Sequence, residues 1–391
     1  MKRPEALFLT PESPYPTIGG GPLRTASLLE YLVQQYTVAV VVFRQPGEED
    51  PRNSFPGGKV RDIHVLELPL HSKSPSSRLL RNGVRFVRNR PPLLDRFSGF
   101  ESALQRIGSG RQYDVGVIEH FWCAPYATQL RAACRKLVLD LHNVESVWHD
   151  RLAHTSTGVP ALAHKRFAAA YRRLERTLLP QFDSVLVTSA ADRNLVAPFA
   201  APNAIKIYPN ALPLIPLPRR AEQFSIVFSG NLEYEPNIAA VRFFAAKIWP
   251  VLRERWPGLI WEIIGKNPQA IARIVAGDSS IRLTGPVPDA VSAIARSQVA
   301  VVPLLAGSGT RLKILEAWAA GTPVVSTTLG AEGLDYVSGE TLLLADAPRP
   351  FAEQVSNLLE SSQERNRIGQ AGRQLYESSY TWQAAWRSLS F

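Results

Sequence analysis

The chain has 391 residues and a formal net charge of +10; 45% of its residues are hydrophobic and 20% are charged. This length predicts two domains, and the composition excludes a disordered or fibrous protein. No apolar run is long enough to span a bilayer, and we expect no signal peptide in the short apolar N-terminus. The two cysteines, Cys123 and Cys134, lack metal-binding or redox spacing, which favours a cytoplasmic location.

Much of the positive charge lies in residues 71–100, where one lysine and six arginines accompany a single acidic residue, Asp95. Apolar residues alternate with these cations, so the segment could lie on an anionic membrane surface. The alternative is a solvated helix flank in a basic protein. We expect reversible contact with the inner face of a membrane. A second basic group, within residues 164–176, is expected along another helix.

Short apolar strands alternate with helices along the chain. We expect strands at residues 6–10, 38–43, 115–118, 136–141 and 184–188, and then at 225–229, 259–265, 281–284, 298–303, 323–326 and 341–344. Helices are expected between them, for example at 26–35, 238–255 and 289–296. Fully apolar strands separated by helices predict parallel sheets covered on both faces. A proline-rich break at 209–222 predicts two Rossmann-like domains of the α/β class facing across a cleft.

The segment from Ala306 to Val325 is the most informative part of the sequence. A glycine-rich loop opens a short helix, whose first turn offers backbone N–H groups to a phosphate. Arg311 and Lys313 lie in or beside that turn, and Glu316 lies on the same helix face as Lys313. Phosphate-binding groups next to a carboxylate that accepts from sugar hydroxyls indicate a nucleotide or nucleotide-sugar site. An amphipathic helix with a solvated Lys–Glu pair is the alternative.

Two histidines follow expected strands, where polar groups of parallel sheets meet ligands. His142 follows the strand at 136–141 and His120 follows the strand at 115–118. For either one, a structural hydrogen bond at the strand end is the alternative. The chain has no Asp-x-Asp pair, P-loop, His-Glu-x-x-His or Gly-x-Ser-x-Gly motif, so we expect no catalytic metal, no cofactor and no serine nucleophile.

A series of motifs now points to one family. They are Asp140–Asn143, Val187–Ser189, Tyr208–Asn210, Phe228–Asn231, Ile263–Pro268, Leu283–Val287, Val301–Pro303 and Leu315–Val325. With these motifs the chain resembles the retaining GT-B glycosyltransferases of group one, also called glycosyltransferase family four. The variant Gly-Thr-Arg-Leu-Lys at 309–313 resembles a branch associated with bacterial exopolysaccharide assembly.

The resemblance implies roles for several residues. Glu316 matches the second glutamate of the family's Glu-x7-Glu motif, which holds the ribose hydroxyls, whereas Ser308 stands where the first glutamate is expected. Asn231 stands where the family has an arginine for the diphosphate, so Arg311 and Lys313 are the candidates to replace that charge. His142 matches the histidine beside the donor sugar and diphosphate.

The resemblance therefore implies a metal-independent glycosyltransferase that moves a hexosyl group from a nucleoside diphosphate sugar, UDP- or GDP-linked, to an acceptor glycan or glycolipid. The catalytic candidates are His142, Arg311 and Lys313, and the donor-binding candidates are Gly20, Gly21, Gly230, Asn231, Lys266, Thr284, Val287, Ser308, Gly309, Thr310 and Glu316. The implied organisation is an acceptor domain at 1–210, a linker at 211–222, a donor domain at 223–375 and a helix at 376–391 that crosses back to the first domain.

Two other classes of protein remain open at this point. A nonhydrolysing sugar-nucleotide epimerase shares the two-domain architecture and would form an epimer without an acceptor. A non-catalytic protein that binds nucleotide sugars is also compatible with the site residues. Nucleic acid is not an expected partner, because the basic segments lack an aromatic–basic recognition motif.

Overall fold

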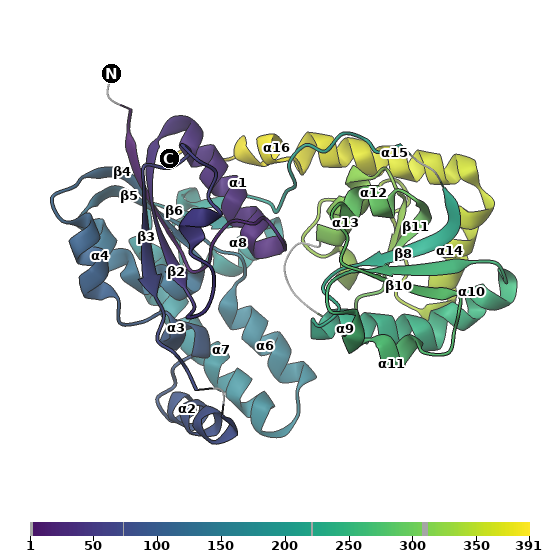
Figure 1. Ribbon diagram of the computed structural model, residues 1–391, viewed down its shortest axis with the longest axis horizontal. Coiled ribbons are helices and arrows are strands. Elements are labelled where there is room, and N and C mark those ends of the chain that lie inside the picture. Colours follow the sequence, from purple (N-terminus) through teal and green to yellow (C-terminus); the bar gives the residue numbers. More distant parts are fainter. Residues whose placement is uncertain (1–2, 73, 220–221, 307–311) are drawn as a thin grey trace. The chain divides into compact units, whose positions relative to one another are not determined.

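The computed structural model describes residues 3–72, 74–219, 222–306 and 312–391. The chain forms two units: the first contains the residues up to Pro209 together with Trp386–Phe391, and the second is Asn210–Ala385 (Figure 1). Within the described residues, none of the helices combines the length and apolar character needed to cross a membrane.

The first unit is built around a sheet of seven parallel strands in the order β3-β2-β1-β4-β5-β6-β7. The strands are β1 (Glu5–Thr10), β2 (Thr37–Arg44), β3 (Asp62–Glu67), β4 (Tyr113–Glu119), β5 (Cys134–Asp140), β6 (Ser184–Val187) and β7 (Ile205–Ile207). The central strands β1 and β2 are buried almost throughout, as their apolar sequences require. The carboxyl ends of all these strands lie at one edge of the sheet, where the polar residues that follow them gather.

The helices of the first unit are α1 (Gly20–Gln35), α2 (Pro75–Val87), α3 (Pro92–Arg96), α4 (Glu101–Gly108), α5 (Ala127–Arg131), α6 (Glu145–Thr155), α7 (Gly158–Leu178) and α8 (Ala190–Val196). Short 3₁₀-helical turns occur at Pro51–Asn53, Phe121–Tyr126, Leu179–Gln181 and Pro202–Ala204. Helices α6 and α7 pack against each other as a hairpin, and α2 lies near them (Figure 1). Arg166 of α7 donates to the carbonyls of Phe86 and Val87, which ties the end of α2 to this hairpin.

The second unit has a parallel sheet of six strands in the order β10-β9-β8-β11-β12-β13. They are β8 (Gln223–Ser229), β9 (Ile260–Ile264), β10 (Ile281–Gly285), β11 (Ser297–Val302), β12 (Val324–Ser326) and β13 (Leu343–Leu344). The helices are α9 (Glu235–Phe243), α10 (Trp249–Arg255), α11 (Ala272–Val275), α12 (Ala290–Ile294), α13 (Leu312–Ala319), α14 (Pro348–Glu360), α15 (Ser362–Ser379) and α16 (Trp382–Trp386), with 3₁₀ turns at Pro268–Ala270 and Leu329–Ala331.

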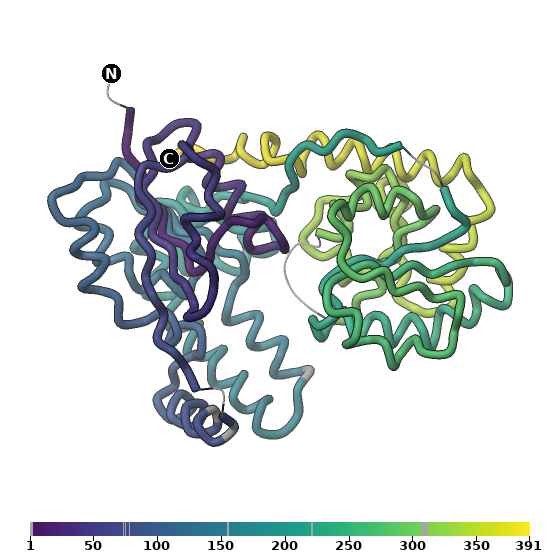
Figure 2. Tube along the Cα trace, viewed as in Figure 1, coloured from purple at the N-terminus to yellow at the C-terminus, as the bar shows by residue number. Residues whose placement is uncertain are grey.

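The end of the chain returns to the first unit. The indole N–H of Trp386 donates to the Ser27 carbonyl of α1 at 3.1 Å, and the Tyr31 hydroxyl donates to the Leu389 carbonyl at 3.0 Å. In Figure 2 the yellow C-terminal end of the tube accordingly lies beside purple N-terminal segments. Where the sequence predicts one helix over 376–391, the structure has the end of α15, the short α16 and a tail without helix.

Four elements differ from the sequence-based expectation. The edge strands β3 and β7 were not expected, because their mixed polar and apolar residues do not form a fully apolar run. Helix α1 begins at Gly20 rather than at residue 26, after Gly19 with φ 104°, a backbone conformation that favours glycine. The helix expected at 238–255 begins at Glu235 and contains a π-helical turn at Phe244–Ile248, immediately before α10 with its proline.

Candidate active site

In the first unit, two neighbouring strands deliver charged side chains to the same point of the sheet. Strands β4 and β5 are paired in register, with Glu119 opposite Asp140 as their last residues. His142 follows two residues after Asp140, and all three side chains are buried. Helix α1 adds Arg24 from its inner face. The fold therefore encloses two carboxylates, an imidazole and a guanidinium at the carboxyl edge of the sheet.

Short hydrogen bonds connect these four groups. His142 Nε2 lies 2.6 Å from Glu119 Oε2 and 3.3 Å from Asp140 Oδ2. Arg24 Nε and Nη2 both donate to Asp140, at 2.7 and 2.5 Å, in the bidentate arrangement that suits guanidinium and carboxylate. Thr25 donates its hydroxyl to Glu119 Oε2 at 3.2 Å. Arg24 thus neutralises Asp140, and His142 neutralises Glu119.

This environment sets the charge of His142. Burial lowers the pKa of His142, but hydrogen bonds to Asp140 and Glu119 outweigh burial and raise the pKa to about 9. Burial and the neighbouring Asp140 raise the pKa of Glu119. Burial also acts to raise the pKa of Asp140, but Arg24 and His142 together outweigh burial and lower it. At neutral pH, His142 is a buried imidazolium that can donate to an anionic group.

Glu119, Asp140 and His142 also bring their potential ligand atoms within 4.8 Å of one another, as a metal site would. Both Asp140 oxygens, however, already accept from Arg24. A metal ion would additionally have to displace the proton that His142 holds at neutral pH. The donor set therefore fits an ion-pair network better than a metal centre.

His120 extends the network through its ring. Its ring stacks on His142, with centroids 3.6 Å apart, and on Trp122, with centroids 4.2 Å apart. Burial, His142 and Arg24 lower the pKa of His120 well below its ordinary value, so this ring is neutral. Its Nε2 is buried without a hydrogen-bond partner among the described residues. His120 thus orients and covers His142.

Gly20 and Gly21 lie in the first turn of α1 and not in the loop before it. The Glu12 carboxylate lies close to this turn, because a Cβ built on Gly21 would be 2.7 Å from Glu12 Oε1. The backbone N–H groups and the dipole at the first turn of a helix stabilise negative charge. They would stabilise the Glu12 carboxylate and any other anion near this turn. A side chain at position 21 would require the Glu12 carboxylate to move aside.

The second unit presents a separate polar cluster at the end of β8. Ser229, its last residue, donates its hydroxyl to Glu316 Oε2 on α13 at 3.3 Å. Burial raises the pKa of Glu316, while Ser229 and Lys313 oppose that rise. Lys313 Nζ donates to Asn237 Oδ1 at 2.7 Å and lies 4.2 Å from the centre of the Phe228 ring. The predicted Lys–Glu face of this helix is therefore directed into the protein and is not a solvated flank.

Two glycines allow the backbone at this cluster to pack closely. Gly230 has φ 148°, and a Cβ on it would be 2.9 Å from Asn237 Nδ2 and 3.3 Å from Lys313 Nζ. A Cβ on Gly265 would lie only 1.7 Å from the Gly230 carbonyl oxygen. The ends of β8 and β9 can meet in this way only because position 265 has no side chain.

The remaining donor-binding candidates lie around the same strand ends. Asn231 is a turn residue whose Oδ1 accepts from the Glu233 backbone at 3.2 Å and from Asn267 at 3.1 Å. Lys266 is exposed, Thr284 is exposed and bonds Glu262 at 3.3 Å, and Val287 is half-buried. Ser308, Gly309, Thr310 and Arg311 lie outside the described residues, so the structure does not test them.

Sequence reasoning missed Arg24, Glu119 and Trp122 as members of the site. An arginine on the buried face of an otherwise apolar helix, as at Arg24, was the available signal, because such a residue requires a buried anion. Glu119 directly precedes the candidate His120 and ends an apolar strand, which was a second signal.

Comparisons with known proteins give the family. A model described as a glycosyl transferase 4-like domain matches residues 19–211, and one described as glycosyl transferases group 1 matches residues 223–361. A protein of Klebsiella pneumoniae, described as an uncharacterized 44.6 kDa protein in the cps region, is 23% identical over 270 residues, which are 66% of this chain and 68% of that protein.

Solved structures share the fold of the chain. HepE of Anabaena, crystallised with UDP and glucose, has a TM-score of 0.67 at 15% identity. The match covers 97% of this chain and 96% of the HepE chain. Sucrose-phosphate synthase of Thermosynechococcus elongatus has a TM-score of 0.71 at 16% identity. This match covers 98% of this chain and 96% of the synthase chain. These likenesses confirm the predicted GT-B fold. Because the two family models together span most of its length, the chain belongs to the group-one glycosyltransferases.

Proposed function

We propose that the protein is a retaining hexosyltransferase that uses a UDP- or GDP-linked sugar, needs no metal ion, and works in the assembly of a bacterial polysaccharide or glycolipid. The family supports transfer of a sugar. HepE is crystallised with UDP and glucose, which favours a nucleoside diphosphate donor. The Klebsiella relative is described by its position in a cps region, which favours a role in polysaccharide assembly.

His142 is the feature that carries the proposal. Transfer of a sugar from a nucleoside diphosphate places growing negative charge on the departing phosphate, and a fixed cation in a water-poor site stabilises that charge strongly. The imidazolium of His142, held by Glu119 and Asp140, is such a cation. We propose that His142 stabilises the negative charge on the leaving phosphate.

The second unit supplies the donor-binding groups in this proposal. Glu316 accepts from the ribose hydroxyls, and Lys313 exchanges its bond to Asn237 for the diphosphate. Arg311 adds charge, and the backbone of Ser308, Gly309 and Thr310 contributes N–H donors. We assign supporting roles to Gly20, Gly21, Gly230, Asn231, Lys266, Thr284 and Val287 around the donor.

The proposed reaction breaks the bond between the anomeric carbon and the β-phosphate oxygen. The acceptor hydroxyl oxygen forms its bond to the anomeric carbon on the same face, through a transition state with oxocarbenium character. The acceptor's proton passes to the departing phosphate oxygen, which serves as the base. The products are the glycosylated acceptor and the protonated nucleoside diphosphate.

Thermal shift against UDP-, GDP-, ADP- and dTDP-sugars, followed by turnover with the best donor, tests the proposal. We expect Glu316→Ala to weaken donor binding by roughly ten- to a hundredfold, because the ribose loses a charge-assisted hydrogen bond. Glu353→Ala, an exposed carboxylate on α14, is the control and should bind normally. A wild-type protein that binds none of these donors would refute the proposal, and epimer formation without an acceptor would identify an epimerase instead.

We further propose a cytoplasmic protein that reversibly contacts the inner face of an anionic membrane through residues 71–100. Helix α2 supports this, because its side chains Leu79, Leu80 and Val87 are 76%, 72% and 75% exposed beside several arginines. Flotation with anionic vesicles at low salt should carry the protein upward. Recovery of all protein in the soluble fraction would contradict membrane contact.

A further inference from the structure

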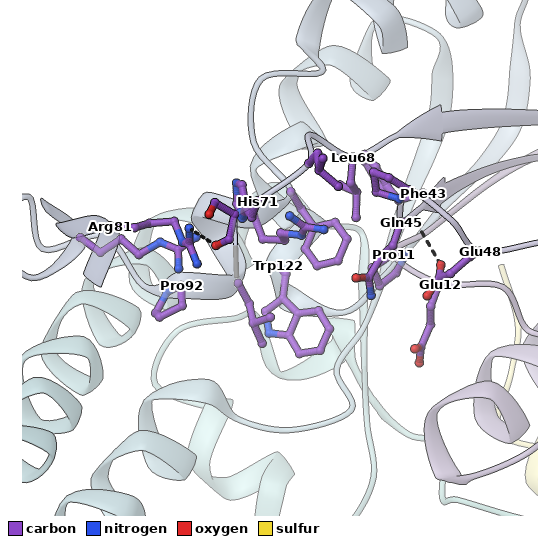
Figure 3. A pocket seen from close by; sticks show the side chains of 17 residues that line it. Pro11, Glu12, Phe43, Gln45, Glu48, Leu68, His71, Arg81, Pro92 and Trp122 are labelled. Atoms are coloured by element: carbon purple, nitrogen blue, oxygen red, sulfur yellow. Dashed lines mark hydrogen bonds between the residues drawn. The ribbon is translucent and has the colours of Figure 1, made fainter. Parts of the chain in front are cut away.

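A cavity of about 720 Å³ opens in the first unit beside the carboxyl ends of β2 and β3. Its volume is within the range of sites that hold a small-molecule ligand. The wall includes apolar side chains of Phe43, Leu68, Leu93, Phe97 and Trp122. Figure 3 shows Glu12 and Glu48 at one end, His71 and Arg81 at the other, and Trp122 between them. The cavity therefore has an acidic end and a basic end.

Three arginines, Arg81, Arg85 and Arg96, line the cavity on the basic side. Arg85 is paired with Asp95 at 2.8 Å, while Arg96 donates to the Pro69 carbonyl at 3.0 Å and Arg81 to the Ser72 carbonyl at 3.4 Å. Each guanidinium has five N–H donors, and the buried Nε of Arg81 has no partner among the described residues.

The arginines also act on one another electrostatically. Desolvation and the charges of Arg85 and Arg81 lower the pKa of Arg96. Desolvation, Arg96, Arg81 and Arg85 lower the pKa of His71, which is therefore neutral at pH 7. The three positive charges repel one another in a partly desolvated cavity, and a bound anion would relieve that repulsion.

The opposite end of the cavity leads to the candidate catalytic histidine. Glu12 lines the cavity; desolvation raises the pKa of its carboxyl, and the nearby charge of His142 opposes that rise. The rings of His142, His120, Trp122 and Phe97 form a continuous stack, with centroid separations of 3.6, 4.2 and 5.9 Å. Since Trp122 and Phe97 also line the cavity, this stack joins its apolar wall to the proposed reaction site.

We propose that this cavity binds an acidic acceptor, with a phosphate or carboxylate of the acceptor held by Arg81, Arg85 and Arg96 and its reactive hydroxyl at the Glu12 end. This inference rests on the proposed transferase function and adds the chemical class of the acceptor. The apolar wall contacts the sugar between the two ends. A neutral acceptor offers no anionic group to Arg81 and Arg96 and binds more weakly.

Calorimetry without a donor or vesicles tests this with three probes that differ in one group: p-nitrophenyl glucoside, its glucuronide and its 6-phosphate. We expect at least one anionic probe to bind roughly tenfold more tightly than the glucoside, the size of a charge-assisted hydrogen bond. Arg96→Gln and Arg81→Gln should each remove most of this preference and leave glucoside binding unchanged. Arg135→Gln, which removes an exposed charge paired with Asp114, should retain it.

The two anionic probes separate a phosphate-bearing from a carboxylate-bearing acceptor, and a preference for either supports the inference. Equal binding of all three probes, or no measurable binding of either anionic probe at millimolar concentration, overturns it. If Arg96→Gln and Arg135→Gln lose the preference for anionic probes equally, the preference is a general charge effect and the inference is overturned. Arginine variants that lose binding to anionic vesicles but keep their preference for an anionic probe would likewise overturn the inference.

Donor binding separates this inference from the proposed function. Thermal shift with the nucleotide sugar should be normal in Arg81→Gln and Arg96→Gln, which also shows that both variants fold. If the wild type binds a donor but shows no preference for anionic probes, only the inference about the acceptor fails. If the wild type binds no donor, the transferase proposal itself fails.

Discussion

His142 carries a positive charge in the interior of the first unit because two carboxylates surround it. Asp140 alone could not supply that charge balance, since Arg24 already occupies both of its oxygens. Glu119 is the additional anion, and Thr25 and His142 both bond its Oε2. The proton on His142 is therefore a property of the whole network.

The raised pKa of His142 predicts a specific dependence of stability on pH. Its pKa is about 9 in the folded protein and 6.5 ordinarily, so the folded state binds the proton more tightly. This stabilisation is fully present below about pH 6.5 and is lost as pH rises through about 9. We expect the free energy of unfolding in urea to fall across this window by up to about 3 kcal/mol more in the wild type than in His142→Gln.

The exposed His154 provides the control for this measurement. His154→Gln should reproduce the wild-type pH profile, because the slope belongs to the buried imidazolium. The difference between wild type and His142→Gln is the relevant quantity, since other groups, such as the cysteines, also affect stability at high pH. A difference that does not change between pH 6 and 9 would contradict a protonated His142.

At the scale of elements, the turn after β8 and the turn after β9 depend on each other. We expect Gly265→Ala to cost about 3 kcal/mol or more, because its Cβ would overlap the Gly230 carbonyl oxygen at 1.7 Å. Gly258→Ala, at the other end of β9, is the matched control, since its Cβ would meet Phe224 at an ordinary 3.9 Å. Urea unfolding of both variants measures the difference; equal stability would exclude backbone contact as the reason for Gly265.

The elements that the sequence predicts best are those buried on both faces. Central strands such as β1 and β2 are continuous apolar runs, so their positions and type were predictable. The edge strand β3 has the sequence Asp-Ile-His-Val-Leu-Glu and is only partly buried, so hydrophobic periodicity alone does not identify it. The start of α1 was missed because a run of glycines followed by proline is typical of a loop.

The candidate site could be recognised in the sequence where its residues lie close together along the chain. His142 follows a strand, and Lys313 and Glu316 share one helix face, so both patterns are visible within a few residues. The pairing of Arg24 with Asp140 joins positions 116 residues apart, and no local pattern encodes it. The acidic and basic ends of the cavity likewise come from distant segments, of which only the basic one was recognisable in the sequence.

At the scale of the whole molecule, the last residues of the chain stabilise its first unit. We expect a chain that ends at Ala385 to lose about 2–4 kcal/mol of stability in that unit, because Trp386 and Leu389 no longer contact α1. Hydrogen exchange followed by peptide can measure this, with faster exchange expected in α1 and β2. Peptides from β8 and β11 in the second unit are the internal control, and equal acceleration in both units would contradict a local effect.

The same return of the chain has a consequence for synthesis. Residues 386–391 belong to the first unit but leave the ribosome after all of the second unit, whose residues 210–385 are continuous in sequence. Trp386 and Leu389 can therefore contact α1 only after all residues of the second unit have been synthesised. The first unit is therefore translated first for the most part, yet its packing is completed only by the residues that are translated last.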